Sequence, residues 1–185
     1  MCSRGKGAKI LISGLFDLSI CDILASTFGR DQGMRSGLTK LQQEGIKQRL
    51  AQNPVVDFMG IQLLRVASGQ ATLMLPNQEA LHNSLGLLQG GILGVLADVA
   101  GGVSLYSVLP DPIKVAIPTI EFKLNFFRPA RHQDVVASGK LVHRGRQIAV
   151  CQVEVSSEEG VLLATGVFTY MIKYLHEEQG IEHRA

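Results

Sequence analysis

The sequence predicts an α+β domain in which an antiparallel β-sheet wraps around one long central helix. Residues 90–109 read GGILGVLADVAGGVSLYSVL, which is apolar almost throughout and long enough for a helix. Later segments alternate apolar and polar residues, as half-buried antiparallel strands do. Short connections of hairpin length separate these segments. A helix this apolar needs a sheet curled around it to bury its surface.

Length and composition limit the function classes. At 185 residues, the chain is long enough for one domain with a substantial core. Its net charge of +2 at pH 7 is too small to indicate a nucleic-acid partner. Cys2, Cys21 and Cys151 are widely spaced and form no CxxC pair, which favours a reducing compartment and therefore the cytoplasm. The histidines show no metal-ligand spacing, so we expect neither a metal nor another cofactor.

Residues 1–52 are predicted to be an N-terminal extension, partly disordered, with a short helix. Asp17 and Asp22 interrupt the early apolar run, so we expect neither a signal peptide nor a membrane span. Residues 1–35 have weak amphipathic character, whereas Leu38–Gln52 has helical spacing that ends at Pro54. The domain itself is placed at residues 53–174, and a charged tail at 175–185.

Two strands are predicted before the central helix and four after it. The first pair is Phe58–Val66 and Gln70–Leu75, joined by a turn at Ser68-Gly69. Thr119–Phe126 alternates cleanly, and we expect its apolar face (Ile120, Phe122, Leu124 and Phe126) to be buried. The remaining strands are Asp134–His143, Gln147–Ser156 and Val161–Tyr174.

The central helix carries a single carboxylate, Asp98, near its middle. On a helical wheel the apolar face comprises Ile92, Leu93, Leu96, Val99, Ala100 and Val103. Asp98 points the other way, on a stripe that also holds Gly91, Gly94, Gly101 and Gly102. Glycine inside a helix costs about 0.8–1 kcal/mol relative to Ala, so something is expected to approach this stripe closely. Because one sheet cannot cover both sides of the helix, we expect a two-fold dimer.

An irregular loop over residues 77–89 leads into this helix and carries His82, Asn83 and Gln89. The run HNSLGLLQGG at residues 82–91, followed by Asp98, resembles the active-site signature of hotdog-fold acyl-CoA thioesterases of the phenylacetate-degradation thioesterase (PaaI)-like family. That signature is an Asn, then His-Gly-Gly opening the central helix, then an Asp nine residues after the His. Residues 119–129 (TIEFKLNFFRP) and the hairpin HRGR at 143–146 are also similar to this family. The resemblance covers roughly residues 53–172 and implies a hotdog fold.

Asn83, Gly90, Gly91 and Asp98 match the family pattern in identity and spacing, but Gln89 stands where the family usually has His. A glutamine amide cannot transfer protons as an acid or a base, although it can donate a hydrogen bond to a carbonyl oxygen. A CoA thiol, with a pKa of about 8.5 like a free cysteine, leaves readily as a thiolate. Loss of the His is therefore compatible with thioester hydrolysis.

The chemistry predicted for this site is attack on a thioester carbonyl. The free N–H of Gly90 at the positive end of the helix would polarise the carbonyl, a contribution of about 2.7–4 kcal/mol in comparable oxyanion sites. Asp98 would act either as a base on water or as a nucleophile. Gly90 and Asp98 lie about 12 Å apart along the helix axis, so within one subunit they are too far apart to contact the same carbonyl. The resemblance implies that Asp98 comes from one subunit while Asn83 and the helix N-terminus come from the other, with Thr119 adding a hydroxyl contact.

Candidate contacts to the CoA moiety lie mostly in turns. Basic residues there can pair with its phosphates, and Arg144 and Arg146, which flank Gly145 in a hairpin, are the strongest candidates. The others are Gly91, Arg128, Arg131 and Lys140. The acyl chain is expected in an apolar slot at the dimer interface.

The predicted function is hydrolysis of an acyl-CoA thioester to free acid and CoA by a homodimer, or by a tetramer made of two dimers. The alternative is a non-catalytic acyl-CoA-binding or sensing module on the same fold, suggested by Gln89 and by the N-terminal extension. A hydratase of the same fold lacks support, because the expected Asp-x-x-x-x-His pair is not found. Neither nucleic acid nor membrane is an expected partner.

Overall fold

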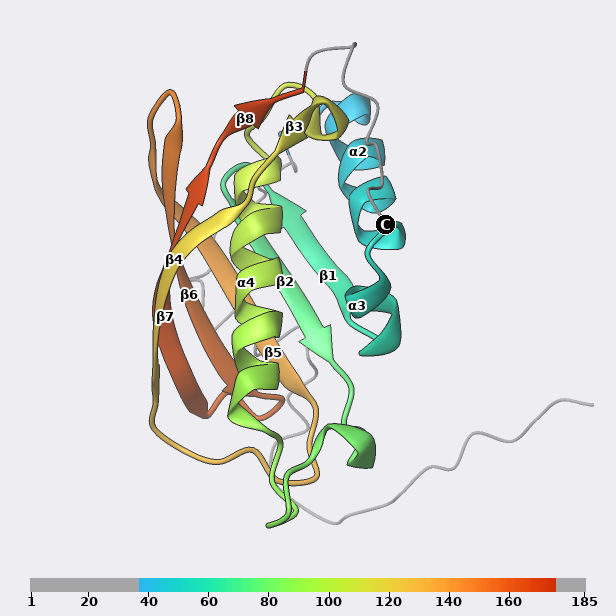
Figure 1. Cartoon of the computed structure of the whole chain (residues 1–185). Coiled ribbons are helices and arrows are strands. Elements are labelled where there is room, and N and C mark those ends of the chain that lie inside the picture. The colour runs from blue at the N-terminus through green and yellow to red at the C-terminus, as the bar shows by residue number, and fades with distance from the viewer. Residues whose placement is uncertain (1–36, 176–185) are drawn as a thin grey trace, which may run out of the picture.

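A six-stranded antiparallel sheet curls around a single long helix in the computed structural model, which describes residues 37–175 (Figure 1). The strand order is β1-β2-β5-β6-β7-β4. The strands are β1 (Gln62–Ala67), β2 (Gln70–Leu75), β4 (Thr119–Phe126), β5 (Val135–Arg144), β6 (Ile148–Ser157) and β7 (Leu162–Met171). The predicted α+β architecture is therefore confirmed, with each of these strands except β1 within a few residues of its expected bounds. The expectations for residues 1–35 and for the end of the tail lie outside the described residues.

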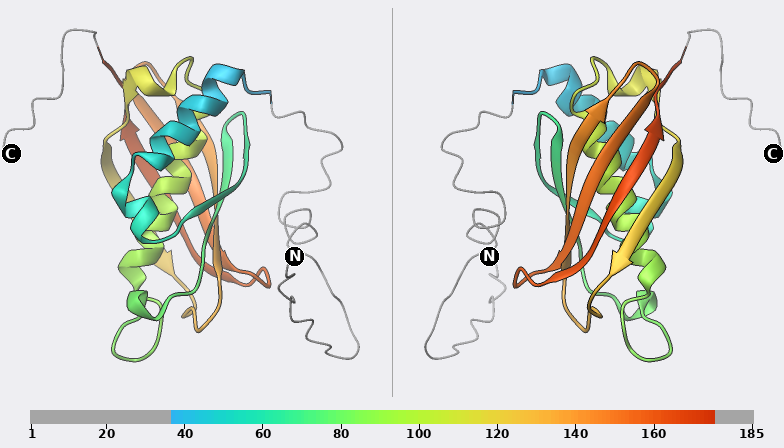
Figure 2. Two further views of the ribbon diagram at one scale, coloured as in Figure 1. Left: turned by 90° about the vertical axis from the view of Figure 1, so that its right-hand side faces the viewer. Right: turned by 90° about the vertical axis from the view of Figure 1, so that its left-hand side faces the viewer.

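The remaining elements are short apart from two helices. They are α2 (Lys40–Ala51), α3 (Pro54–Phe58), the 3₁₀ turns η1 (Glu79–Leu81) and η2 (Pro112–Lys114), α4 (Gly90–Tyr106), and the two-stranded pair β3 (Val115–Ala116) and β8 (Lys173–Tyr174). The helices form one layer and the sheet forms the other (Figure 2). Within the described residues, none of the helices is both long and apolar enough to cross a membrane.

The central helix α4 packs against β2, β5 and β6 and contributes Leu93, Leu96 and Ala100 to the core. Its contact with β5 is backbone against backbone. A Cβ added at Gly139 would lie 2.5 Å from the carbonyl oxygen of Ala100, so only glycine fits there. This close approach seats α4 deep in the curled sheet, which fixes the direction in which its outward face points.

The predicted glycine stripe is only partly correct. Gly91 and Gly94 have open space where a Cβ would be, but Gly101 faces the sheet, where a Cβ would collide with the hydroxyl of Tyr170. Conversely, Val99, expected on the buried face, is only half-buried. The helical wheel assigns the faces of α4 by hydropathy, whereas the sheet packs closest to α4 where the helix carries small residues.

The first strand begins later than predicted. Residues around Phe58 form α3 instead, and Phe58 itself is 74% exposed. The Asn53 side chain caps α3 by accepting hydrogen bonds from the N–H groups of Val55 and Val56, and Pro54 occupies the first turn. A proline that ends one helix can start the next, because its missing N–H is not needed at that position.

Strand β4 has the predicted bounds, but the burial expected for its apolar face is wrong. Ile120, Phe122 and Phe126 are 51%, 54% and 54% exposed. The face is oriented inward, since the Phe122 ring stacks on Phe168 at 5.1 Å between centroids. However, β4 is an edge strand that pairs only with β7 among residues 37–175, so these residues leave much of its apolar surface uncovered.

Helix α2 forms within the predicted Leu38–Gln52 segment and packs beside the C-terminal half of α4 (Figures 1 and 2). Thr39 and Gln42 form a reciprocal capping box at its start. Ile46 is fully buried in the same core as α4, and the Gln42 amide donates to the carbonyl oxygens of Ser107 and Leu109. This part of the predicted extension is thus tied to the end of the central helix.

Candidate functional site

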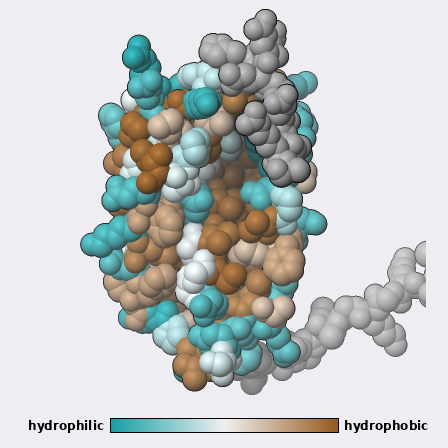
Figure 3. Space-filling model, viewed as in Figure 1, coloured by the Kyte–Doolittle hydropathy of each residue, from teal (hydrophilic) through white to brown (hydrophobic). Residues whose placement is uncertain are grey.

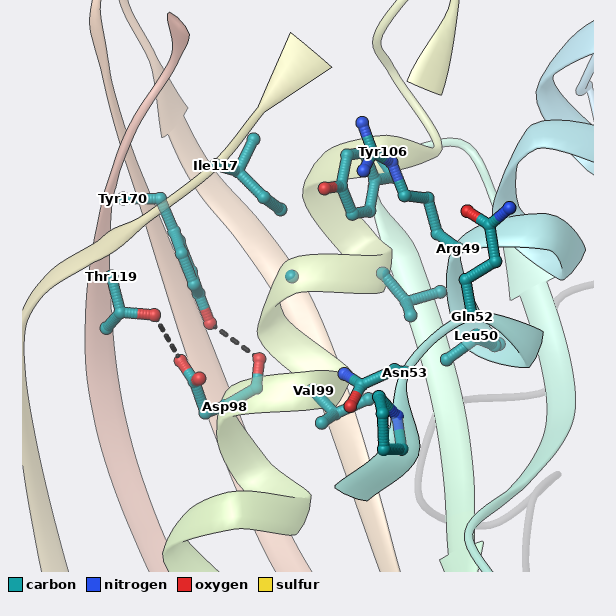
Figure 4. Close-up of a pocket in the computed structure, with 13 residues that line it drawn as sticks. Arg49, Leu50, Gln52, Asn53, Asp98, Val99, Tyr106, Ile117, Thr119 and Tyr170 are labelled. Carbon is teal, nitrogen blue, oxygen red and sulfur yellow. Dashed lines mark hydrogen bonds between the residues drawn. The ribbon is translucent and has the colours of Figure 1, made fainter. Parts of the chain in front are cut away.

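Asp98 lies midway along α4 and is half-buried. Its carboxylate oxygen Oδ1 accepts a 2.8 Å hydrogen bond from the hydroxyl of Thr119 on β4, and its backbone carbonyl accepts a 2.8 Å bond from the hydroxyl of Tyr170 on β7 (Figure 4). Burial raises the pKa of the Tyr170 phenol, and the neighbouring Asp98 charge raises it further. The phenol therefore remains a donor, and two adjacent strands hold the helix segment that carries the carboxylate.

A cavity of about 420 Å³ opens beside Asp98 and Thr119. Its opposite wall comes from the α2–α3 junction, including Leu50 and Asn53, and Tyr106 of α4 stands farther along it (Figure 4). The space-filling view shows hydrophobic residues gathered along the centre of this face, over α4 (Figure 3). The carboxylate thus borders a space of the size that small-molecule sites occupy, about 300–1,000 Å³.

The N-terminus of α4 offers unused hydrogen-bond donors. Gln89 is the N-cap residue, but its side chain is exposed and makes no capping hydrogen bond. Among residues 37–175, no acceptor is bonded to the backbone N–H of Gly90 or Gly91. The ring of Phe126 packs beside Gly90, 3.6 Å from where its Cβ would be. Such a helix end favours a partial negative charge, for example a polarised carbonyl oxygen.

Asn83 shapes the loop that leads into this helix end. Its side-chain oxygen accepts hydrogen bonds from the N–H groups of Leu85 (2.9 Å) and Leu87 (3.2 Å). The loop also contains Gly86 in a left-handed conformation (φ 69°). Upstream, His82 Nε2 lies 2.9 Å from Asn77 Oδ1. The side-chain carbonyl of Asn83 is thus occupied by the loop's own N–H groups, whereas its side-chain amide nitrogen has no partner in the described part of the chain.

The predicted site residues fall into separate groups within one protomer. Asp98 and Thr119 are together in the middle of α4, while Asn83, Gln89, Gly90 and Gly91 are together at its N-terminus. Along α4, Asp98 is eight residues beyond Gly90, about 12 Å at the rise of an α-helix. No single carbonyl can contact both groups of one chain.

The candidate CoA contacts lie at the two ends of the sheet. Arg144, Gly145 and Arg146 form the β5–β6 hairpin beyond the C-terminal end of α4, where Arg144 donates to the carbonyl oxygen of Val108. Arg128 lies at the other end and donates to the carbonyl oxygen of Leu162. Arg131 and Lys140 are also exposed. Within the described residues, no group of His, Cys, Asp and Glu side chains could hold a metal ion.

Several residues at the site were not candidates from the sequence. Tyr170 lies on the inward-facing side of β7 two residues after the buried Phe168, so a hydroxyl in a buried alternating strand was the available signal. The wall formed by Leu50 and Asn53 had no such signal, because it depends on how α2 packs against α4.

Comparison with known proteins places this architecture in a class. Two solved structures superpose with TM-scores of 0.67 and 0.66: the PaaI protein of Escherichia coli (17% identity, 75% of this chain and 99% of PaaI) and a thioesterase family protein from Silicibacter pomeroyi (24% identity, 72% and 98%). These similarities define the class as the hotdog thioesterase fold, as predicted.

Sequence relatives narrow the class to a family. The model of the thioesterase superfamily matches residues 85–164. The Halobacterium salinarum protein named "Putative esterase VNG_1336C" is 32% identical over 104 residues, covering 55% of this chain and 68% of its own length. The medium/long-chain acyl-CoA thioesterase YigI of Escherichia coli is 26% identical over 127 residues, covering 62% and 82%. The chain belongs to the thioesterase superfamily.

Proposed function

We propose that this protein is an acyl-CoA thioesterase, which hydrolyses an acyl-CoA to the free acid and CoA. The observation that carries the proposal is the Asp98 carboxylate, held by Thr119 at the wall of a cavity. Membership of the thioesterase superfamily and the similarity to YigI support the same reaction class. A free, buried Cys151 agrees with action in the reducing cytoplasm.

The reaction requires two protomers in this proposal. Asp98 of one chain acts as the base on water or as the nucleophile, and the Gly90 N–H of the other chain polarises the thioester carbonyl. The exposed apolar residues of the β4 edge (Ile120, Phe122, Phe126 and Phe127) support a second copy as the cover. An exposed apolar edge strand can pair with other chains and cause aggregation, so a specific partner that covers this edge is favoured. A homodimer satisfies this, and two such dimers can form a tetramer.

The remaining residues have supporting roles. Asn83 and Gln89 flank the carbonyl site through their amides, and Thr119 orients Asp98. Gly91 leaves the helix end open to the substrate, while Arg128, Arg144, Gly145 and Arg146 meet the CoA moiety. Arg128 and the Arg144–Arg146 hairpin lie at opposite ends of one protomer. In this proposal one CoA molecule therefore contacts either Arg128 or the hairpin of a given chain, but not both.

The Asp98→Asn variant tests the proposal. The amide keeps the size of the carboxylate but can neither accept a proton nor attack, so we expect acyl-CoA hydrolysis to fall about 10²–10⁴-fold. Release of CoA is followed with a thiol reagent over a panel of acyl-CoAs. Glu154→Gln, a matched change on the exposed outer face of β6, should retain wild-type turnover.

Two outcomes decide between the candidate functions. Full turnover by Asp98→Asn would remove this carboxylate from the mechanism. Saturable binding of acyl-CoA without thiol release by the wild-type protein would instead favour the non-catalytic sensing module, for which the exposed Gln89 in place of His is the motivating feature.

A further inference from the structure

The loop that leads into α4 is closed by a short two-stranded neck, which comprises residues 81–83 and 87–89. His82 pairs with Leu88 there in an isolated antiparallel bridge. Two backbone hydrogen bonds flank the bridge: the Asn83 N–H donates to the carbonyl oxygen of Leu87 (2.7 Å), and the Gln89 N–H donates to that of Leu81 (3.0 Å). Helix α4 begins directly after the neck, at Gly90. The neck therefore sets where this helix end lies relative to the loop.

The two faces of the neck carry different side chains. A bridge flanked in this way is a non-hydrogen-bonded pair, whose two side chains lie close together on one face, so His82 and Leu88 share a face. Because side chains alternate along an extended strand, Asn83 and Gln89 point to the opposite face. His82 therefore does not replace the His that Gln89 displaces from the family pattern. It lies behind the two residues that flank the proposed carbonyl site.

The His82 side chain is held by groups from two other segments. Its Nε2 lies 2.9 Å from Asn77 Oδ1, and because a carboxamide oxygen only accepts, Nε2 carries the proton and donates. The Asn77 N–H in turn donates to Asp134 Oδ1 at 2.8 Å. The His82 ring also meets the His132 ring edge to face, with 5.2 Å between the centroids. These contacts tie the neck to the end of β2 and to the β4–β5 connection.

The two strands of the neck are anchored differently. In one strand, the Leu88 N–H donates to the carbonyl oxygen of Ala130 at 3.1 Å, and both residues are buried. In the other, the His82 N–H donates only to Glu79 of the same loop, at 3.0 Å, so the side chain of His82 supplies the link to the rest of the fold on this face. Loss of that link should loosen one strand of the neck and leave the core intact.

Building on the proposed thioesterase function, we propose that His82 is a positioning residue whose hydrogen bond to Asn77 keeps the neck closed. The two donors of the carbonyl site come from opposite strands of the neck: Asn83 follows His82, and Gly90 follows Gln89. Opening the neck therefore separates the Asn83 amide from the Gly90 N–H. Donors of this kind act on charge that develops in the transition state, so their displacement lowers kcat more than it weakens substrate binding.

The His82→Phe variant keeps a ring against His132 but loses the donor to Asn77. We expect kcat for acyl-CoA hydrolysis to fall about threefold to tenfold, the range that corresponds to one hydrogen bond, while KM stays within about twofold. His82→Gln should recover most of the loss, because its amide nitrogen is as many bonds from Cα as Nε2 is. His82→Asn, whose amide is closer to the backbone, should not.

Removing the acceptor tests the same bond from the other side. Asn77→Ala should lower kcat as His82→Phe does, and the double variant should be no slower than either single variant, because both changes remove one interaction. Asn77 is exposed, so this variant also serves if His82→Phe fails to fold, which thermal unfolding checks.

Glu79→Gln is the matched control and should retain wild-type kcat. Glu79 is an exposed residue of the same loop, and its side chain makes no hydrogen bond within residues 37–175. Wild-type kcat in folded His82→Phe, or losses that multiply in the double variant, would mean that His82 does not act through Asn77.

Amide hydrogen exchange separates this inference from the proposed function, because it needs no activity. In His82→Phe, the N–H groups of Asn83 and Gln89 should exchange about threefold to tenfold faster than in the wild type, while those of β6 keep their rates. If the wild-type protein hydrolyses no acyl-CoA, the proposed function fails, but this faster exchange still supports the role of His82 in closing the neck. Equal exchange of both N–H groups in the two proteins overturns it.

Discussion

Cys151 shows how strongly one buried group can couple stability to pH. Burial raises the pKa of its thiol to about 11, and the hydrogen bond from Ser104 (3.4 Å to Sγ) only partly opposes this. The unfolded chain forms thiolate near pH 9, whereas the folded chain retains its proton until about pH 11. Between these values the folded state binds more protons, so the free energy of unfolding must fall as pH rises.

The expected loss from Cys151 is at most roughly 3 kcal/mol, because a pKa difference of one corresponds to about 1.4 kcal/mol. Urea unfolding at pH 8 and at pH 11 measures it. Burial also raises the pKa of Tyr106 and Tyr170, so the wild type must be compared with Cys151→Ala, which retains both phenols. Parallel declines in the two proteins would show that the thiol is not the source.

The sequence identified some residues of the site better than others. Asp98 is conspicuous as a lone carboxylate in an apolar helix, whereas Thr119 is a candidate only through the family resemblance. Their 2.8 Å hydrogen bond joins positions far apart in the chain, which no local pattern encodes. Tyr170 lies in a buried alternating strand, which is a local signal, but the sequence does not show that its hydroxyl bonds the Asp98 carbonyl.

At the scale of elements, the contact between α4 and β7 depends on Gly101 and Tyr170. A Cβ at Gly101 would collide with the Tyr170 hydroxyl, which is held by its bond to the Asp98 carbonyl. Gly101→Ala should therefore destabilise the protein by about 1–3 kcal/mol, although alanine favours a helix by about 1 kcal/mol over glycine. Tyr170→Phe alone should cost about 1 kcal/mol through the lost hydrogen bond.

Combining the two changes tests the contact itself. Phenylalanine removes the colliding oxygen, so the double variant should be more stable than the sum of the single losses predicts. Denaturant unfolding of the four proteins gives the coupling energy. Strictly additive losses would mean that α4 and β7 do not meet as described.

The bounds of the helices and strands were more predictable from the sequence than the way these elements pack against one another. Alternation located β4 to the residue, and tight turns located the hairpins, because both signals are local. Which strand forms the edge is a property of the whole sheet, so the exposure of Phe122 and Phe126 could not be read from the same alternation. Similarly, Pro54 predicts the end of α2, but α3 depends on the cap that Asn53 supplies.

At the scale of the whole molecule, the distance between Asp98 and the start of α4 decides how a site can be assembled. About 12 Å of rigid helix separates the carboxylate from the Gly90 N–H, and no fluctuation of a buried helix closes that distance. In a dimer with a two-fold axis, the Asp98 carboxylate of each chain can lie beside the Gly90 N–H of the other chain. An assembly with this symmetry contains two identical composite sites.

Gly90→Pro removes the proposed donor with little disturbance to the fold. Proline is tolerated at the first helical position, and Gln89 has the extended conformation (φ −61°, ψ 131°) that a residue before proline adopts. Because the Gly90 N–H has no acceptor among the described residues, folding loses no hydrogen bond. Activity should fall about 10²–10³-fold, whereas Gly90→Ala, which keeps the N–H, should lose much less.

Mixing two inactive proteins then tests whether the site spans two chains. In a dimer of one Asp98→Asn chain and one Gly90→Pro chain, one site combines an intact Asp98 with an intact Gly90, and the other site has neither. Equal mixing and refolding make half of the dimers mixed, so roughly a quarter of the wild-type activity should return. Two affinity tags, one on each variant, confirm that mixed dimers have formed. If purified mixed dimers remain as inactive as their parents, the carboxylate and the helix end do not act on a shared thioester across the two-fold axis.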